Sequence, residues 1–368
     1  MCIRDSTNVI LDNYGEYLSY LGLVFYFLFS YIYVINVHLA PKKTPLKLTN
    51  RMNRAIILLF IICFIISMGF IVLSSMYLDF LRFAIVGITP LLLPVLVPFV
   101  HWILKPLEAA INRGYVKRAE KKLTQFPNLI KIGITGSFGK TSTKNFLATI
   151  LSEKYSVCAT PFNFNTPMGI TKTVLQTLSL GHQVFIAEMG ARQTGDIKEL
   201  CEIVEPKYGI LTSIGAQHIA TFKSLENVKK TKAELPIYLE KDGFCVFNMD
   251  SEPVVEIEKT SKCRKCTVSI TNKADIYATD ISTSSEGTHF KLHIGDKVLE
   301  CSTRLLGLHN ISNLLLCVAM ARELKLTDEQ ILSGISKVAP VEHRLQLINA
   351  ENDAVSYTHL TLPTKRIV

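Results

Sequence analysis

Apolar residues follow two different patterns along this chain. Before residue 105 they form three long stretches, roughly 17–39, 55–78 and 83–104, and each approaches the ~20 residues that a membrane-spanning helix needs. This pattern predicts three transmembrane helices over residues 17–104. The first stretch also contains Asn36 and His38, and the third contains three prolines, so either could instead be re-entrant or interfacial.

Basic residues flank the predicted spans. Lysines and arginines gather at 42–54, between the first two spans, and again at 105–122, after the third. With three spans these two segments lie on the same side of the membrane, which the positive-inside rule makes the cytoplasmic side. Residues 105–128 therefore read as a basic juxtamembrane connector, and everything after them is predicted to be cytoplasmic.

From residue 129 onward, short apolar runs alternate with helical patterns. Strands are expected at 129–135, 184–189, 208–213 and 244–248, and helices at 140–153, 195–204, 224–239, 310–324 and 328–338. This alternation predicts an α/β fold, with a mostly parallel sheet covered by helices on both faces. Residues 265–303 contain shorter alternating segments with Gly and Asp turns, and predict a small antiparallel appendage.

The strand at 129–135 leads into a glycine-rich turn that opens directly into a helix. Backbone N–H groups of such a turn bind phosphate oxygens, a lysine adds a positive charge, and a Thr hydroxyl can hold Mg²⁺. The alternative is a Gly/Ser surface loop, but strand, loop and helix occur here in the order that a phosphate-binding loop requires. The candidate nucleotide-binding residues are Gly136, Ser137, Phe138, Gly139, Lys140, Thr141 and Ser142.

This loop departs from the usual nucleotide-binding pattern, because Ile134 stands where that pattern has its first glycine. The version found here, Thr-Gly-Ser-x-Gly-Lys-Thr, resembles that of the Mur ligase family, the ATP-dependent amino-acid and peptide ligases of cell-wall precursor synthesis. The resemblance extends over about residues 129–349. It implies the ATP-binding central domain of that family in a bacterium, with ATP and Mg²⁺ as cofactors. Together with the predicted spans, this gives the bacterial cell membrane as the expected location.

Three residues are candidate metal ligands and catalytic residues together with Lys140 and Thr141. Glu188 ends an apolar strand, and a carboxylate at that edge of a parallel sheet suits Mg²⁺. The segment Glu188-Met-Gly-Ala resembles the branch of the family that adds D-alanyl-D-alanine. His218 follows the next strand and resembles a family ligand of a second Mg²⁺, although Ser213 replaces the usual Asn. Lys232 stands where the family has a carbamylated lysine; without the resemblance it reads as part of a solvated helix face.

Further segments resemble the family's nucleotide and substrate contacts. Gly-x-His-Asn-x-x-Asn implies that His309, Asn310 and Asn313 lie against the nucleotide, although a helix N-terminus with an Asn cap explains the same residues. Arg344 resembles the hinge arginine that reaches the phosphates. The Asn-rich turn resembles the loop that lines the nucleotide-peptide substrate, through Asn163, Asn165 and Thr166.

Charge and cysteine content narrow the function further. The formal charge of +9 is of the order that the juxtamembrane clusters supply, so they favour anionic lipid, and a nucleic-acid role is rejected. Cys263 and Cys266 form a C-x-x-C pair, but no second pair at comparable spacing completes a zinc site. Since the cytoplasm keeps thiols reduced, no disulfides are expected.

The resemblance implies a ligase that joins D-alanyl-D-alanine to a UDP-muramoyl tripeptide through an acyl phosphate. Alternatives are a membrane-bound relative that uses a lipid-linked precursor and another amino acceptor, or makes a poly-glutamate-type polymer, and a non-catalytic ATP-binding scaffold. Counterparts of the family's uridine-nucleotide-binding and C-terminal domains are missing, so this chain is expected to be an inactive fragment. Residues 1–6 and 355–368 resemble translated sequencing adapters; a genuine disordered tail is the alternative for residues 355–368.

Overall fold

The computed structural model describes residues 48–77, 81–215, 219–240, 242–284, 287–340, 347–349 and 355–357. The expected span at 17–39 and the N-terminal segment 1–6 lie outside these residues. The chain divides into two compact units, an N-terminal unit of residues 1–113 and a C-terminal unit of residues 114–368. Each unit is described by itself below.

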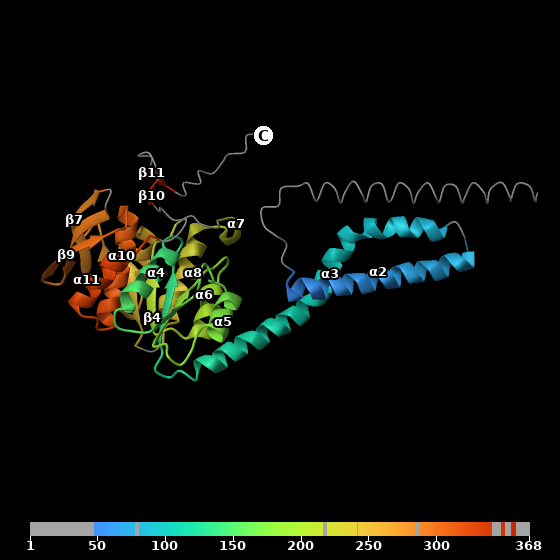
Figure 1. Ribbon diagram of the computed structural model, residues 1–368, viewed down its shortest axis with the longest axis horizontal. Coiled ribbons are helices and arrows are strands. Elements are labelled where there is room, and N and C mark those ends of the chain that lie inside the picture. The colour runs from blue at the N-terminus through green and yellow to red at the C-terminus, as the bar shows by residue number, and fades with distance from the viewer. Residues whose placement is uncertain are drawn as a thin grey trace, which may run out of the picture. The chain divides into compact units, whose positions relative to one another are not determined.

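Two long helices make up the described part of the N-terminal unit, α2 (Asn50–Tyr77) and α3 (Leu81–Leu123), which continues into the C-terminal unit (Figure 1). Arg54 Nη2 and Glu108 Oε1 form an ion pair at 2.7 Å between them. Among described residues, two segments are long and apolar enough to cross a membrane, Asn50–Gly69 with mean hydropathy 2.2 and Leu92–Leu123 with 1.4. Because α3 is continuous, the segment predicted as a separate connector begins inside a helix.

A nine-stranded mixed sheet organises the C-terminal unit, in the order β2-β3-β1-β4-β5-β6-β7-β8-β9. The first seven strands in this order pair in parallel, β8 pairs antiparallel with β7, and β9 pairs antiparallel with β8. The strands are β1 (Ile130–Thr135), β2 (Val157–Ala159), β3 (Val184–Glu188), β4 (Tyr208–Leu211), β5 (Phe244–Asn248), β6 (Arg264–Ser269), β7 (Ile276–Ser284), β8 (Gly287–Ile294) and β9 (Lys297–Thr303). A separate antiparallel pair consists of β10 (Leu347–Asn349) and β11 (Val355–Tyr357).

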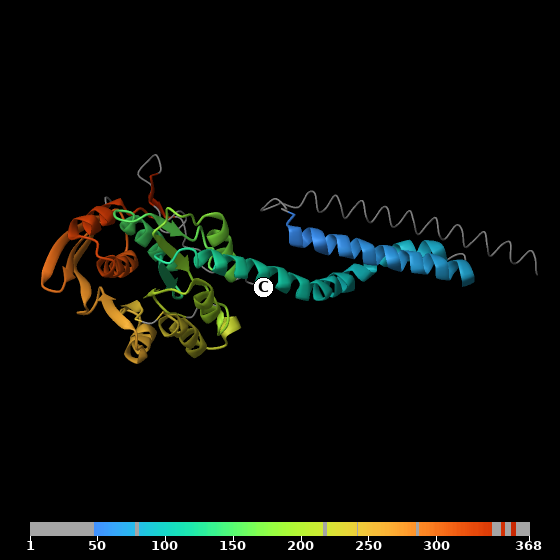
Figure 2. The same ribbon diagram turned by 90° about the horizontal axis from the view of Figure 1, so that it is seen from below.

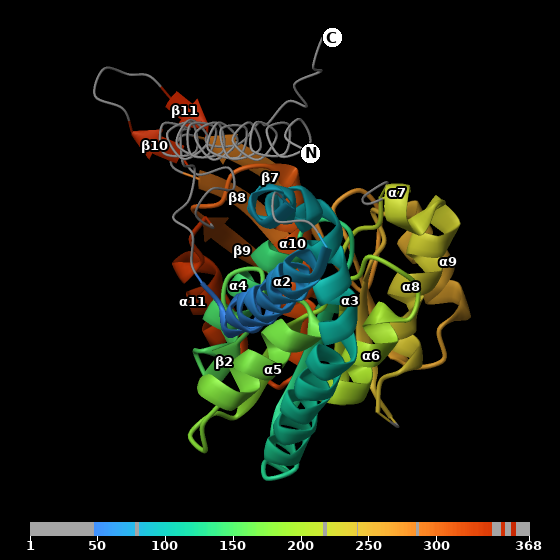
Figure 3. The same ribbon diagram turned by 90° about the vertical axis from the view of Figure 1, so that its right-hand side faces the viewer.

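Helices cover both faces of this sheet, in the two layers seen in Figure 3. One layer contains α4 (Lys140–Leu151), α10 (Leu308–Glu323) and α11 (Asp328–Lys337). The other contains α5 (Pro167–Gln176), α6 (Asp196–Val204), α8 (Leu225–Ile237) and α9 (Glu252–Thr260), while the short α7 (Ile219–Phe222) precedes α8. The parallel sheet between two helical layers is the α/β fold that the alternating pattern predicts.

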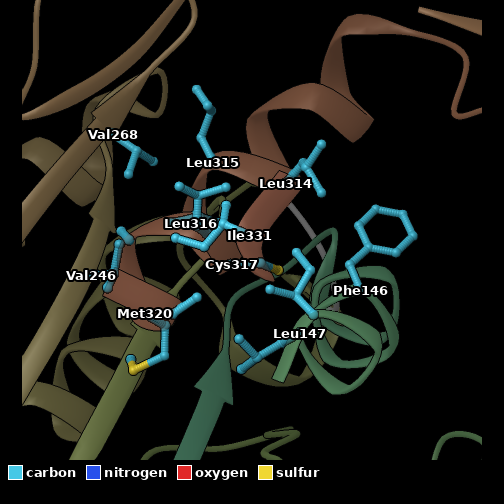
Figure 4. Packing of buried hydrophobic residues seen from close by; sticks show 14 of the residues in the cluster. Phe146, Leu147, Val246, Val268, Leu314, Leu315, Leu316, Cys317, Met320 and Ile331 are labelled. Atoms are coloured by element: carbon cyan, nitrogen blue, oxygen red, sulfur yellow. The ribbon is translucent and has the colours of Figure 1, made fainter. Parts of the chain in front are cut away.

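Side-chain alternation along β3 shows how the two layers are held. Val184 and Ile186 belong to the apolar cluster under α4 and α10, whereas Phe185 and Ala187 belong to the cluster under α5 and α6. Figure 4 shows the first cluster, where Phe146 and Leu147 of α4 lie near apolar side chains of α10. Each fully buried side chain of this kind contributes roughly 1.5–3 kcal/mol to stability, so the strand ends between the layers are firmly placed.

Several elements differ from the sequence-based expectation. Within the predicted antiparallel appendage at 265–303, β6 instead pairs in parallel with β5 and β7. Only β7, β8 and β9 form an antiparallel segment, and it continues the main sheet; its strands are orange in Figure 2. The pattern did not predict β2, α5, α9 or β7. The C-terminal unit also begins earlier than the predicted residue 129. Ala119 and Leu123, at the end of α3, are buried in its cluster under α5 and α6.

Candidate active site

The phosphate-binding loop connects β1 to α4 at the carboxyl edge of the sheet. Gly139 caps α4 in the left-handed conformation (φ 81°), and a Cβ atom there would overlap the side-chain oxygen of Asn313. Thr212 Oγ1 donates to the carbonyl oxygen of Phe138 at 2.6 Å, which ties the loop to the end of β4. The tight turn and the close approach of Asn313 both require glycine at position 139.

The polar groups of this loop make contacts that the sequence does not predict. The Ser137 and Phe138 amides, expected to face phosphate, both donate to the carbonyl oxygen of Ser213, at 2.6 and 3.4 Å. Lys140 Nζ donates to the carbonyl oxygens of Gly136 and Ser137, both at 2.9 Å. The loop thus carries a cation at the predicted position, held within one turn of its own backbone.

Glu188 lies at the end of β3 with its side chain 1% exposed. Its Oε1 accepts a hydrogen bond from Asn165 Nδ2 at 3.1 Å, and its Oε2 forms an ion pair with Lys144 Nζ at 3.2 Å. The Glu188 backbone amide donates to Thr160 Oγ1 at 3.1 Å. Strand pairing and three side-chain contacts therefore fix this carboxylate beside the phosphate loop.

Lys232 projects from α8 and is buried, and it faces the same cavity as Lys140. The pKa of the Lys232 ammonium is lowered to about 7, mainly by burial and also by the positive charge of Lys140, while Asp196 and Glu234 act in the opposite direction. The neutral amine is consequently well populated near pH 7 to 8. This local environment contradicts the reading of Lys232 as part of a solvated helix face.

A cavity of about 550 Å³ brings these groups together. Its walls come from the phosphate loop, the Asn-rich loop (residues 162–166) before α5, the end of β3, the start of α6, and α8. The predicted residues that line it are Ser137, Phe138, Gly139, Lys140, Thr141, Asn163, Asn165, Thr166, Glu188 and Lys232. Sequence positions almost one hundred residues apart therefore converge at one edge of the sheet, where α/β folds place their ligands.

The other predicted residues lie elsewhere. Asn310 and His309 lie in the first turn of α10, whose N-cap is Gly307 without a side-chain cap hydrogen bond, so Asn310 is not the cap that the sequence suggested. Asn310 Nδ2 donates to the Leu306 carbonyl oxygen at 2.8 Å. Asn313, one turn later, lies against Gly139 of the phosphate loop. His218 and Arg344 fall outside the described residues.

The sequence analysis missed several charged residues of the site. Asp196 and Glu199, on the first turn of α6, line the cavity together with Arg192. Asp196 Oδ2 accepts hydrogen bonds from the amides of Arg192 and Gln193, at 2.7 and 3.1 Å. Lys144 was also missed, although the spacing from Lys140 shows that it lies one helical turn further along α4.

Among the described residues, no cluster of three or more His, Cys, Asp or Glu side chains could hold a metal ion. The cavity instead offers the carboxylate of Glu188 and the hydroxyl of Thr141. Mg²⁺ is commonly bound through one or two carboxylates together with substrate phosphates and water. The residues present therefore fit Mg²⁺ bound as a nucleotide complex.

Comparison with known proteins identifies the family. Residues 134–321, just over half of the chain, match the model of the Mur ligase middle domain. The chain belongs to the Mur ligase family. It is 35% identical over 227 residues to the UDP-N-acetylmuramoyl-tripeptide–D-alanyl-D-alanine ligase of Mycobacterium tuberculosis, over 61% of this chain and 44% of that protein. The chain thus spans about half the length of the curated relatives it matches.

Solved structures show the same relationship. The structure of MurF from Acinetobacter baumannii is 25% identical, with a TM-score of 0.63 over 67% of this chain and 54% of that one. MurF ligase from Thermotoga maritima, solved in complex with ADP, is 24% identical, with a TM-score of 0.60 over 65% of this chain and 55% of that one. These matches confirm the predicted family and its α/β fold.

Proposed function

We propose that the full-length protein is an ATP-dependent ligase that joins D-alanyl-D-alanine to a UDP-muramoyl tripeptide through an acyl phosphate. The observation that carries this proposal is the convergence of the phosphate loop, Glu188 and Lys232 on one cavity. Family membership and the names of the relatives supply the substrates. A scaffold that only bound nucleotide would not require a buried carboxylate and a buried lysine beside the phosphate loop.

In this proposal each part of the cavity has a chemical role. Lys140 neutralises phosphate charge, and the Thr141 hydroxyl and the Glu188 carboxylate provide oxygen ligands. Mg²⁺, when bound, stabilises the negative charge that develops on the transferred phosphoryl group. One wall of the cavity is formed by the Asn-rich loop, through Asn163, Asn165 and Thr166, and these residues orient the carboxylate substrate. His309, Asn310 and Asn313 contact the nucleotide from α10.

Lys232 is proposed to carry a carbamate. A carbamate forms when a neutral amine attacks CO₂ and loses a proton, and the lowered pKa of Lys232 supplies that amine near neutral pH. The product is an anion at the cavity wall, where it can serve as a further oxygen ligand. In the proposal, His218 and Arg344 complete the metal and phosphate contacts.

We also propose that the protein is anchored in the bacterial membrane by its N-terminal unit, with the ligase unit in the cytoplasm. The segment Asn50–Gly69 supports this, because it is apolar over 20 residues, and Phe60, Phe64 and Ile65 on it are exposed in the structure. Basic residues before α2 and along the second half of α3 have the distribution typical of cytoplasmic flanks.

Substitution of Lys232 tests the ligase proposal. In the full-length protein, Lys232→Ala should bind ATP normally but ligate at least a hundredfold more slowly. Added short carboxylic acids should restore part of the rate, because they can occupy the space of the carbamate. Phosphate release that depends on both UDP-muramoyl tripeptide and D-alanyl-D-alanine is the measurement.

Two comparison variants make the result specific. Lys140→Ala should lose ATP binding, with no recovery on adding acids, because it removes the cation of the phosphate loop. Glu188→Ala should not be rescued by the acid concentrations that rescue Lys232→Ala. Wild-type ligation by Lys232→Ala without additives would show that Lys232 has no role in the reaction.

A further inference from the structure

The ion pair between Lys144 and Glu188 is unusual because both side chains are almost completely buried, with exposures of 2% and 1%. Removing two charges from water is costly, so a buried ion pair is weak evidence for stability alone. Because Glu188 is itself a candidate metal ligand, this pair calls for another explanation. The other contacts of Lys144 and Glu188 provide one.

Lys144 joins two parts of the site. From α4, its Nζ donates to Glu188 Oε2 at 3.2 Å and also to the carbonyl oxygen of Phe162, in the Asn-rich loop. Phe162 has a left-handed backbone (φ 46°), a strained conformation for an aromatic residue. The contact with Lys144 helps to hold this conformation.

The same loop reaches Glu188 by a second route. Asn165 Nδ2 donates to Glu188 Oε1 at 3.1 Å, and the Asn165 carbonyl oxygen accepts from the Gly190 amide at 2.8 Å. A Cβ atom at Gly190 would lie 2.7 Å from Asn165 Cγ, so the loop fits closely over the end of β3. Both carboxylate oxygens of Glu188 are thus oriented by donors that also fix the loop.

Charge balance is the chemical consequence of this arrangement. The negative charge of Glu188 is already matched by the ammonium of Lys144. Lys140 and Arg192 also line the cavity, as do the carboxylates of Asp196 and Glu199 on the first turn of α6. A divalent cation that entered alone would meet at Glu188 a carboxylate whose charge is already compensated, with the ammonium of Lys140 in the same cavity. A cation that enters with the phosphates of a nucleotide brings its own compensating negative charge.

From these contacts we infer that Lys144 is a positioning residue, which holds Glu188 and the Asn-rich loop together and makes divalent-cation binding depend on bound nucleotide. This inference rests on the proposed nucleotide-dependent ligase function. It assigns Lys144 no contact with substrate. Its effect is to order the binding events, because metal and nucleotide enter as one complex.

Mn²⁺ binding to the full chain, followed by the electron paramagnetic resonance signal of free Mn²⁺, tests this inference. We expect the wild type to bind Mn²⁺ at least tenfold more weakly alone than with a non-hydrolysable ATP analogue. Lys144→Met removes the charge and keeps the apolar stem, and should bind Mn²⁺ alone at least tenfold more tightly than the wild type. Lys144→Gln, which keeps hydrogen-bond donors, should show the same gain.

Two controls separate the pair from general charge effects. Lys172→Met removes an exposed lysine whose ammonium lies over the ring of Phe164 in the same loop, and it should leave Mn²⁺ affinity unchanged. Glu188→Gln in the Lys144→Met background should abolish the gain. Thermal melts of each variant show whether it folds.

The outcomes distinguish the inference from the function on which it rests. Equal Mn²⁺ affinity in the wild type with and without the analogue would overturn the inference, even if no Lys144 variant folds. So would folded Lys144 variants with wild-type Mn²⁺ affinity. Failure of the analogue to bind, or of the full-length protein to ligate, would instead reject the proposed function.

Discussion

At the scale of single residues, Cys263 has an environment different from that of the other cysteine in its C-x-x-C motif. A hydrogen bond with Cys245 lowers the pKa of the Cys263 thiol to about 7, whereas burial raises that of Cys266 to about 12. Both thiols are free in the structure. Since the thiolate is the nucleophile, the two cysteines should differ greatly in reactivity.

We expect iodoacetamide to alkylate Cys263 with a rate that rises between pH 6 and 8 and then levels off, because deprotonation is nearly complete one unit above its pKa. Cys266 should remain unmodified over this range. Peptide mass mapping after timed quenching measures both residues in one experiment. Cys245→Ala removes the hydrogen-bond donor and should shift the Cys263 profile to higher pH, and an unchanged profile in this variant would contradict the role given to Cys245.

Residues of the site were predictable where a motif fixed their spacing, and were missed where only three-dimensional contacts distinguish them. Gly139 and Lys140 follow from the strand, loop and helix pattern. Lys144 has nothing in the sequence to separate it from an exposed helical lysine, because its burial results from the position of Glu188, forty-four residues later. Asp196 was missed because an acidic residue in the first turn of a helix is common and did not indicate that it lines a cavity.

At the scale of elements, two helices of the site begin with a left-handed glycine, Gly139 at α4 (φ 81°) and Gly195 at α6 (φ 94°). They make a matched pair, because a Cβ atom at Gly195 meets nothing within 4 Å, while one at Gly139 overlaps Asn313. The backbone conformation is strained for alanine at both positions. Only at Gly139 is a steric cost added.

Gly195→Ala should therefore lose about 1–2 kcal/mol of unfolding free energy, and Gly139→Ala clearly more, with weaker ATP binding as well. Urea denaturation and nucleotide titration of both variants give the comparison. Equal losses in the two variants would mean that the contact between the phosphate loop and α10 is not tight. ATP affinity should remain near wild type in Gly195→Ala.

The predicted elements were most accurate where apolar runs were bounded by clear turn signals. The strand at Phe244–Asn248 has the predicted limits. Short or weakly patterned elements were missed: β2 has three residues, and α5 follows an Asn-rich turn that hides its start at Pro167. Strand β7 was missed because its polar half alternates on an exposed surface, where the hydrophobic pattern carries little information.

At the scale of the whole molecule, the boundary between the two units determines which fragment of the chain should fold by itself. Alternating apolar runs placed the start of the C-terminal unit near Leu129. In the structure, α3 contributes buried Ala119 and Leu123 to that unit, and Lys122 Nζ donates to the carbonyl oxygens of Leu175 and Leu178 at 3.2 and 2.7 Å. The last turns of α3 therefore belong to the core under α5 and α6.

A truncation series follows from this boundary. A fragment that starts at Gly114 should be soluble without detergent and should bind ATP, because it keeps the end of α3 and discards the apolar helices. A fragment that starts at Leu129 should be less stable by about 2 kcal/mol or more, since it loses two buried apolar side chains. Thermal melts and ATP titration of the two fragments measure this difference.

The full chain supplies the third member of the series. If Asn50–Gly69 spans a membrane, the full chain should sediment with membranes and resist extraction by high salt and alkali, and detergent should release it. Its ATP affinity in detergent should match that of the Gly114 fragment, because the phosphate loop and the cavity lie wholly in the C-terminal unit. Release of the full chain by salt alone would contradict a membrane span and would show that the basic segments attach the chain only by electrostatic contact. The ATP site of the C-terminal unit would be unaffected by that result.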